Sequence, residues 1–169
     1  MALVGRLVAG LAIACFTAAA SAGDLEDGIA AFEAKNFGVA TSKLVPLAEK
    51  DVPEAQFYLA QLHYFGNGVK LDFNKAFDLM RASADREYEP AQRGIVAYMW
   101  VMYGYNMGNI QSRYTPDEFK KEYWKRMRIA LSGNKCEYQY ELRNLAQQFV
   151  EVNREYESEW QQIVRTLRC

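Results

Sequence analysis

The sequence has few of the side chains that build metal sites and catalytic dyads. It contains three cysteines and a single histidine, His63, among 169 residues. A closed zinc site needs about four cysteine or histidine ligands, so none is expected. A serine triad or a cysteine–histidine dyad would have to use His63, and no serine elbow, phosphate loop or metal-ligand motif accompanies it. We therefore predict no catalytic residue, no metal and no cofactor.

An excess of charge of one sign is also lacking. The chain has 20 Lys and Arg residues against 21 Asp and Glu residues, a formal net charge of -1. Proteins that grip nucleic acid usually present a strongly basic surface, so no nucleic-acid partner is expected. The basic residues of segment 120–128 are interspersed with Glu118 and Glu122, which favours a solvated helix face over a patch for an acidic partner.

Long apolar runs are absent apart from one, Leu7–Phe16, and this run is too short for a membrane span of about 20 residues. It follows Arg6 and precedes small residues that end at Ala22, the pattern of a cleaved secretory signal. We predict a signal peptide over residues 1–22 and a periplasmic or secreted protein. A lipoprotein anchored at Cys15 is the less favoured alternative.

A repeat of 36 residues organises the middle of the chain. Small and apolar residues recur in register: Ala40, Leu44 and Ala48 as Ala76, Met80 and Ala84, and the pair Ala55-Gln56 as Ala91-Gln92. Within one repeat, Pro53 suits the first turn of a helix and Gly66 suits its end. Asp72 can then cap a second helix through its side-chain oxygen. The pattern predicts pairs of antiparallel helices that approach closely at alanine.

The stretch Ala55–Asp85 resembles the Sel-one-like repeat, a relative of the tetratricopeptide repeat. The family's pattern is met at Ala55, Gln56, Leu59, Gly66, Gly68, Val69, Asp72 and Ala76. His63 stands where the family often has tyrosine, and Leu79 stands where it often has tryptophan. The resemblance extends, with degraded flanking repeats, over roughly residues 24–132. It implies an α/α solenoid that acts as an adaptor, and exported bacterial members of the family bind envelope, regulatory or host proteins.

We therefore predict an all-α protein with two parts after the signal peptide. Residues 23–135 form a short α/α solenoid of about three helix-hairpin repeats, and residues 136–169 form a C-terminal capping helix or a helical hairpin. Helices are expected at about 24–35, 37–50, 53–65, 72–86, 90–104, 117–131 and from 136 onward. One repeat cannot bury its apolar face alone, so stacked neighbours must complete the core.

The third repeat is about nine residues longer than the second. The counterpart of the cap Asp72 is Asp117, 45 residues further on rather than 36, so the insertion lies near residues 104–115. Insertions in solenoids map to one face and often carry binding. We predict a protein partner that binds the insertion and the concave face of the first helices. The candidate residues are Phe57, Gln61, Arg93, Ala97, Tyr103, Tyr105 and Tyr114.

Aromatic residues gather in the same part of the chain. The cluster consists of Tyr98, Trp100, Tyr103, Tyr105, Tyr114, Tyr123 and Trp124. Tyr and Trp are enriched in interaction hot spots, but they also fill large cores. We expect most of them to fill the third repeat and contact the C-terminal helix, with those of the insertion exposed. Aromatic rings also stack on sugars, so the alternative function is a cell-envelope glycan or peptidoglycan binder, or a weak hydrolase.

The C-terminal segment offers two incompatible structures. Apolar residues recur at steps of three and four over Leu142–Leu167, and no Gly or Pro follows Gly133, which favours one long helix. Such a helix could cap the array or pair two copies into a homodimer. Cys136 and Cys169 suggest a disulfide, yet a straight helix would separate them by about 48 Å. Pairing requires a hairpin near Val152-Asn153, and we favour the continuous helix.

Overall fold

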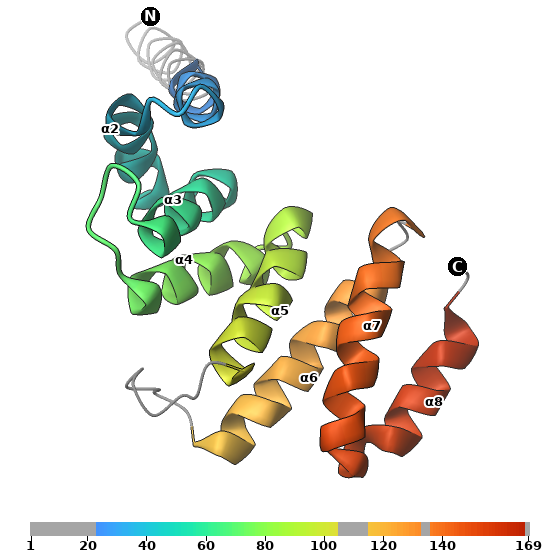
Figure 1. The fold of residues 1–169 in the computed structure, drawn as a ribbon. Coiled ribbons are helices and arrows are strands. Elements are labelled where there is room, and N and C mark those ends of the chain that lie inside the picture. The colour runs from blue at the N-terminus through green and yellow to red at the C-terminus, as the bar shows by residue number, and fades with distance from the viewer. Residues whose placement is uncertain (1–22, 105–114, 133–135, 168–169) are drawn as a thin grey trace, which may run out of the picture. The chain divides into compact units, whose positions relative to one another are not determined.

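A computed structural model describes residues 23–104, 115–132 and 136–167. The predicted signal peptide with Cys15, the residues Tyr105 and Tyr114 of the insertion, and Cys169 lie outside the described residues. The described residues contain helices and no strand, which confirms the all-α helical-repeat fold class (Figure 1).

The helices follow the predicted order, and those before the C-terminal segment have ends within two residues of the predicted ones. Residues 23–33 are helical, and the further elements are α2 (Phe37–Ala48), α3 (Pro53–Phe65), α4 (Phe73–Asp85), α5 (Glu89–Gly104), α6 (Pro116–Ser132), α7 (Cys136–Val152), the short 3-10 helix η2 (Arg154–Tyr156) and α8 (Glu157–Thr166). Contacts between residues divide the chain into two compact units, residues 1–83 and 84–169. The division falls inside the predicted repeat array.

The core of the first unit lies between α2 and α3. Its buried residues include five of the predicted repeat pattern, Ala40, Leu44, Ala48, Ala55 and Leu59, together with Leu47 and Leu62. Leu25 and Phe32, from the helical residues 23–33, pack against this cluster. α4 joins α3 through Ser83, whose hydroxyl donates a 2.6 Å hydrogen bond to the carbonyl oxygen of Pro53. Three of the buried core residues of α2 and α3 are alanines, at positions that the repeat pattern predicted.

The turn between α3 and α4 depends on two glycines. Gly66 ends α3 with a left-handed φ of 69°, which an L side chain rarely adopts. Gly68 has the same φ, and a Cβ there would lie 2.7 Å from the carbonyl oxygen of Phe37. Asp72 then caps α4, because its Oδ1 accepts a 2.9 Å hydrogen bond from the backbone N–H of Lys75. The predicted helix end and cap are both confirmed.

The cap of α6 differs from the one predicted. Thr115, rather than Asp117, occupies the capping position: its Oγ1 accepts a hydrogen bond from the N–H of Glu118, and its own N–H donates to Glu118 Oε2 at 2.8 Å. This reciprocal pair is a capping box. Pro116 stands at the first helical position, where its missing N–H costs nothing. Alignment with Asp72 placed the cap two residues too late.

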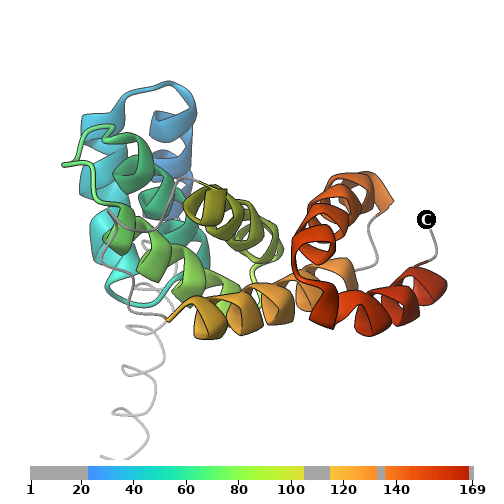
Figure 2. The ribbon, with the colours of Figure 1, turned by 60° about the horizontal axis from the view of Figure 1, so that its bottom comes forward.

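The predicted continuous C-terminal helix is wrong. α7 ends at Val152, η2 turns the chain, and α8 runs back beside α7 in both views (Figures 1 and 2). The break lies at Asn153, which is 2% exposed and has a φ of -123° and a ψ of 73°. Its Nδ2 donates a 2.8 Å hydrogen bond to the carbonyl oxygen of Phe149, as its backbone N–H does at 3.0 Å. A side-chain hydrogen bond to the backbone thus ends the helix at the predicted hairpin point.

Candidate functional site

Gln56, the polar residue of the repeated Ala-Gln pair, is buried at the start of α3. Its Nε2 donates to the carbonyl oxygen of Ala48 at 3.3 Å and to Oδ1 of Asp51 at 3.0 Å. Ala48 ends α2, and Asp51 lies in the following turn with a positive φ of 63°. The amide therefore fixes the connection between α2 and α3, which is a structural role.

His63, the sole histidine, is buried on α3. Its Nδ1 lies 3.2 Å from the carbonyl oxygen of Lys70, and its own carbonyl oxygen accepts a 3.0 Å hydrogen bond from the N–H of Asp72. Since a carbonyl oxygen can only accept, Nδ1 carries the proton in this contact. These two bonds hold the α3–α4 turn against its helix, which agrees with the predicted packing position.

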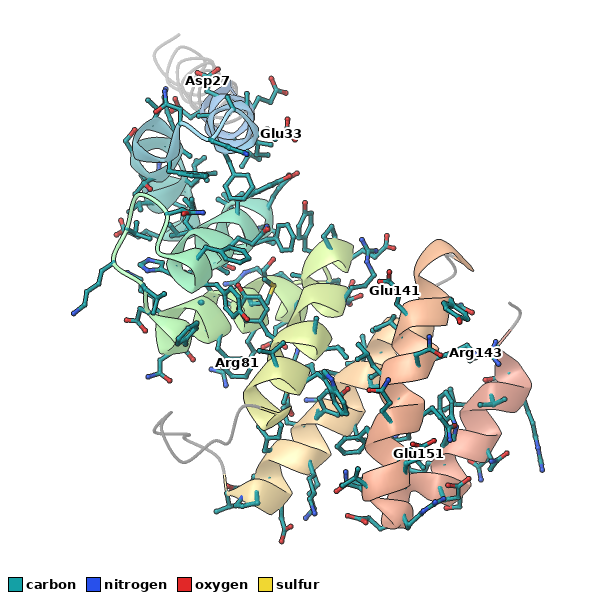
Figure 3. All side chains as sticks on the ribbon, in the orientation of Figure 1. Asp27, Glu33, Arg81, Glu141, Arg143 and Glu151 are labelled. Atoms are coloured by element: carbon teal, nitrogen blue, oxygen red, sulfur yellow. The ribbon has the colours of Figure 1, made fainter. Side chains whose placement is uncertain are left out.

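The outer face of α3 carries two of the predicted partner-binding residues. Phe57 and Gln61 are four residues apart and half-buried, whereas Ala55, Leu59 and Leu62 fill the core on the other side. The rings of Phe57 and Tyr58 pack edge to face, with their centroids 5.2 Å apart. Burial raises the pKa of Tyr58, and the carboxylates of Glu33 and Glu54 raise it further. Figure 3 marks Glu33 on the neighbouring helical segment. This face is aromatic with acidic neighbours.

The predicted residues of α5 also share a face. Arg93 and Ala97 are four residues apart, Ala97 is exposed, and Arg93 forms a 2.7 Å ion pair with Glu89. Tyr103 has a helical backbone at the end of α5, but its side chain lies outside the described part of the chain. Because α3 and α5 belong to different units, the concave face that would join them stays a prediction.

The described aromatic residues of α6 form core rather than surface. Tyr123 and Trp124 are buried. The ring centroid of Phe149 on α7 lies 4.6 Å from that of Tyr123 and 5.8 Å from that of Trp124, on which it stacks. Trp124 also contacts the buried ring of Trp160 on α8, and its Nε1 donates a 2.6 Å hydrogen bond to Glu159. As predicted, these rings pack against the C-terminal segment. They are therefore not exposed for stacking on a sugar, as the alternative function would require.

The basic run of α6 is paired within the second unit. Arg126 is buried and bonds both Asp85, at 2.5 Å, and Glu122, at 2.6 Å. The other ion pairs are Lys120 with Glu155, Lys125 with Glu122 and Arg128 with Glu159. These contacts leave little unpaired charge for an acidic partner. Lys125 and Arg128 are exposed, as predicted, whereas the buried Arg126 does not belong to a solvated face.

Sequence reasoning missed an exposed apolar patch at the α3–α4 turn. Phe65 is 62% exposed, Leu71 is 49% exposed and Phe73 is 39% exposed. Tyr64 joins two of them, with ring centroids 5.0 Å from Phe65 and 5.4 Å from Phe73. These four residues are called the turn patch below. The available signal was a set of large apolar residues in and beside a turn, where the helical core positions do not require them.

The described ranges lack two further features. No group of three or more His, Cys, Asp or Glu side chains there is placed to hold a metal ion. None of the helices in residues 23–104, 115–132 and 136–167 is long and apolar enough to cross a membrane.

Comparison with known families supports the resemblance seen in the sequence. The family model of the Sel1 repeat matches residues 5–24 and 53–88. The second match spans α3, the glycine turn and α4, the part whose packing positions are described above. Searches of curated proteins and of solved structures find no match. Sel1 repeats are generally protein-interaction modules and are typically not catalytic. The chain therefore carries a Sel1 repeat at residues 53–88, the segment that the sequence pattern had indicated.

Proposed function

We propose that the chain is an exported protein-interaction module, an adaptor or regulatory scaffold for a protein of the cell envelope or the extracellular space. The observation that carries the proposal is the Sel1 repeat at residues 53–88. Its first helix buries one face in the α2–α3 core and leaves Phe57 and Gln61 accessible on the other. The signal-like residues 1–22 support export.

The binding surface that we propose combines first-helix residues with the insertion. Phe57, Gln61, Arg93 and Ala97 supply the helix faces, and Tyr103, Tyr105 and Tyr114 supply the insertion. Aromatic side chains and arginine are the residues most enriched at interaction hot spots. The ion pair of Arg93 with Glu89 would hold its guanidinium in place for a partner.

Affinity capture from envelope extract tests this proposal. The chain from Gly23 onward is the bait, and captured proteins are then measured singly against variants. Phe57→Ala with Gln61→Ala, and separately the triple change of Tyr103, Tyr105 and Tyr114 to Ala, should each weaken binding at least tenfold. Val152→Ala is the control: it truncates an apolar side chain on α7 that is 68% exposed, and it should leave binding unchanged.

Two results would contradict the proposal. Binding that survives both sets of changes, with circular dichroism showing an intact fold, would exclude this surface. Cosedimentation of the chain with purified peptidoglycan, abolished by the tyrosine changes, would favour the glycan-binding alternative.

Export has its own test in the mass of the mature protein. Cleavage after Ala22 predicts that the protein recovered from the periplasm or medium begins at Gly23. A chain that begins at Cys15 with added lipid mass would establish the lipoprotein alternative, and a retained Met1 would exclude cleavage.

A further inference from the structure

The turn patch is a group of exposed apolar side chains within the first unit. The ring of Tyr64 contacts the rings of both Phe65 and Phe73 edge-on. Leu71 lies close to Gly66, the residue after Phe65, since a Cβ added at Gly66 would lie 3.1 Å from the Cβ of Leu71. The glycine turn and the α4 cap hold the backbone on both sides, so the patch is presented by a built turn rather than by a free loop.

Two exposed lysines flank this patch. Lys70 precedes Leu71, and Lys75 lies in the first turn of α4; both are exposed, and neither forms an ion pair with a described residue. Lys43 and Arg81, by contrast, are paired with acidic neighbours in the same unit. The one carboxylate between the two lysines, Asp72, is engaged as the cap of α4.

The charge around the patch differs from that of its surroundings. Residues 23–83 contain nine Asp and Glu residues against six Lys and Arg residues. An exposed aromatic surface, flanked by two lysines that pair with no described carboxylate, therefore stands on an otherwise acidic unit. That acidity repels an anionic membrane, while the local lysines attract carboxylates over a short range.

We propose that the turn patch is a docking site for a protein segment that combines apolar side chains with Asp or Glu. The segment's apolar side chains cover Phe65, Leu71 and Phe73, and its carboxylates pair with Lys70 and Lys75. This site rests on the proposed interaction function but is distinct from the surface of Phe57 and the insertion. The repeat would then bind through the end of its hairpin as well as through a helix face.

Selection from a phage-displayed library of random 12-residue peptides tests the proposal. The bait is the chain from Gly23 onward, and one enriched peptide is then synthesised for fluorescence anisotropy. We expect enriched peptides to carry aromatic or aliphatic residues together with an excess of Asp and Glu. Their affinity should fall at least fivefold between 50 and 300 mM NaCl, because the lysine pairs are exposed.

Variants then assign the binding to the patch. The double variant Phe65→Ser, Phe73→Ser should lower the affinity for the peptide at least tenfold. The double variant Lys70→Glu, Lys75→Glu should lower it to the same extent, and it should raise the affinity for a peptide in which Asp and Glu are replaced by Lys. Val39→Ser is the matched control, since Val39 is a 42% exposed apolar residue of the same unit. Protection of Lys70 and Lys75 from acetylation in the wild-type complex, read by mass spectrometry, gives the same answer without a variant.

Several outcomes would overturn the proposal. These are enriched peptides without an acidic excess, equal loss of binding in Val39→Ser, and unprotected lysines in the complex. Binding to vesicles with 30% phosphatidylglycerol but to no peptide would assign the patch to a membrane, and a dimer lost in the phenylalanine variant would assign it to a second copy. Captured envelope proteins that still bind the patch variants would leave the proposed function standing and remove this site alone.

Discussion

At the scale of single residues, the second unit contains a hydroxyl that its surroundings do not satisfy. Tyr123 is buried between Trp100 and Phe149, and its OH has no hydrogen-bond partner among the described residues. Burial raises the pKa of this hydroxyl far above its ordinary value, so the group is neutral. An unsatisfied buried hydroxyl costs about 1–3 kcal/mol.

We therefore expect Tyr123→Phe to leave the free energy of unfolding unchanged or to raise it by about 1 kcal/mol, since the ring contacts remain while the unpaired group is lost. Tyr123→Ala should lower it by about 3–5 kcal/mol because it opens a cavity. Urea unfolding followed by tryptophan fluorescence measures both. A loss of more than about 1 kcal/mol in Tyr123→Phe would mean that the hydroxyl has a partner such as a bound water.

Glu118 predicts a dependence of stability on pH. Two hydrogen bonds from Thr115 hold the pKa of this carboxyl below its ordinary value of 4.5. The bond from the backbone N–H has the larger effect, and the bond from the hydroxyl has the smaller one. Because the folded pKa is the lower one, the stabilisation is present above pH 4.5 and is lost as the pH falls through the folded pKa.

Glu118→Gln should thus destabilise the protein at pH 7 and have a smaller effect near pH 3. Thermal unfolding at the two pH values measures the difference, and Glu141→Gln, on the exposed surface of α7 (Figure 3), corrects for the loss of one charge. An effect of Glu118→Gln that is the same at both pH values would show that the capping box does not depend on the charge.

At the scale of elements, hydrophobic periodicity describes the helices well and their interruptions poorly. The steps of three and four over Leu142–Leu167 continue through Asn153 as if the helix did not end there. Yet Val152 on this stripe is 68% exposed, whereas Trp160 is buried and donates a 2.7 Å hydrogen bond from its Nε1 to Gln147 on α7. The same apolar stripe serves two short helices that face each other.

Replacing Asn153 tests what makes the break. Asn153→Ala removes the side-chain hydrogen bond to the carbonyl oxygen of Phe149, and we expect a loss of about 1–3 kcal/mol with a red shift of tryptophan emission as Trp160 is exposed. A straightened segment would also expose its stripe, so light scattering should detect dimers. Val152→Ala is the control, and unchanged stability and emission in Asn153→Ala would show that packing alone sets the turn.

At the scale of the whole molecule, the hairpin changes the expectation for the cysteines. The distance of about 48 Å that argued against pairing applied to a straight helix, and the helix is not straight. α7 begins at Cys136, and α8 returns toward that same end of the hairpin (Figure 1). We now propose the disulfide between Cys136 and Cys169, provided that the protein is exported to an oxidising compartment.

This disulfide is measured by mass spectrometry after thiol alkylation. In the exported monomer, neither cysteine should react without reductant and both should react after reduction. Two reactive thiols in the unreduced monomer would exclude the pair. A bond between two chains, seen as a dimer on a non-reducing gel, would instead support the homodimer that the sequence also allowed.

The sequence by itself determined the features that depend on neighbouring residues. The buried alanines Ala40 and Ala55, the helix end at Gly66 and the cap at Asp72 follow from spacing and local backbone chemistry, and all were predicted. The resemblance to the Sel1 repeat rests on the same stretch of the chain, residues 53–88.

The tertiary structure decided what depends on distant partners. The local sequence around Asn153 is compatible with either a turn or a continuous helix. Contacts between α7 and α8, such as the hydrogen bond from Trp160 to Gln147, stabilise the turn. Burial of Trp124 against Phe149, rather than exposure to a ligand, likewise depends on a helix 25 residues further along the chain. The turn patch was missed because periodicity shows which residues can be buried, and only the packed helices show which of them are left uncovered.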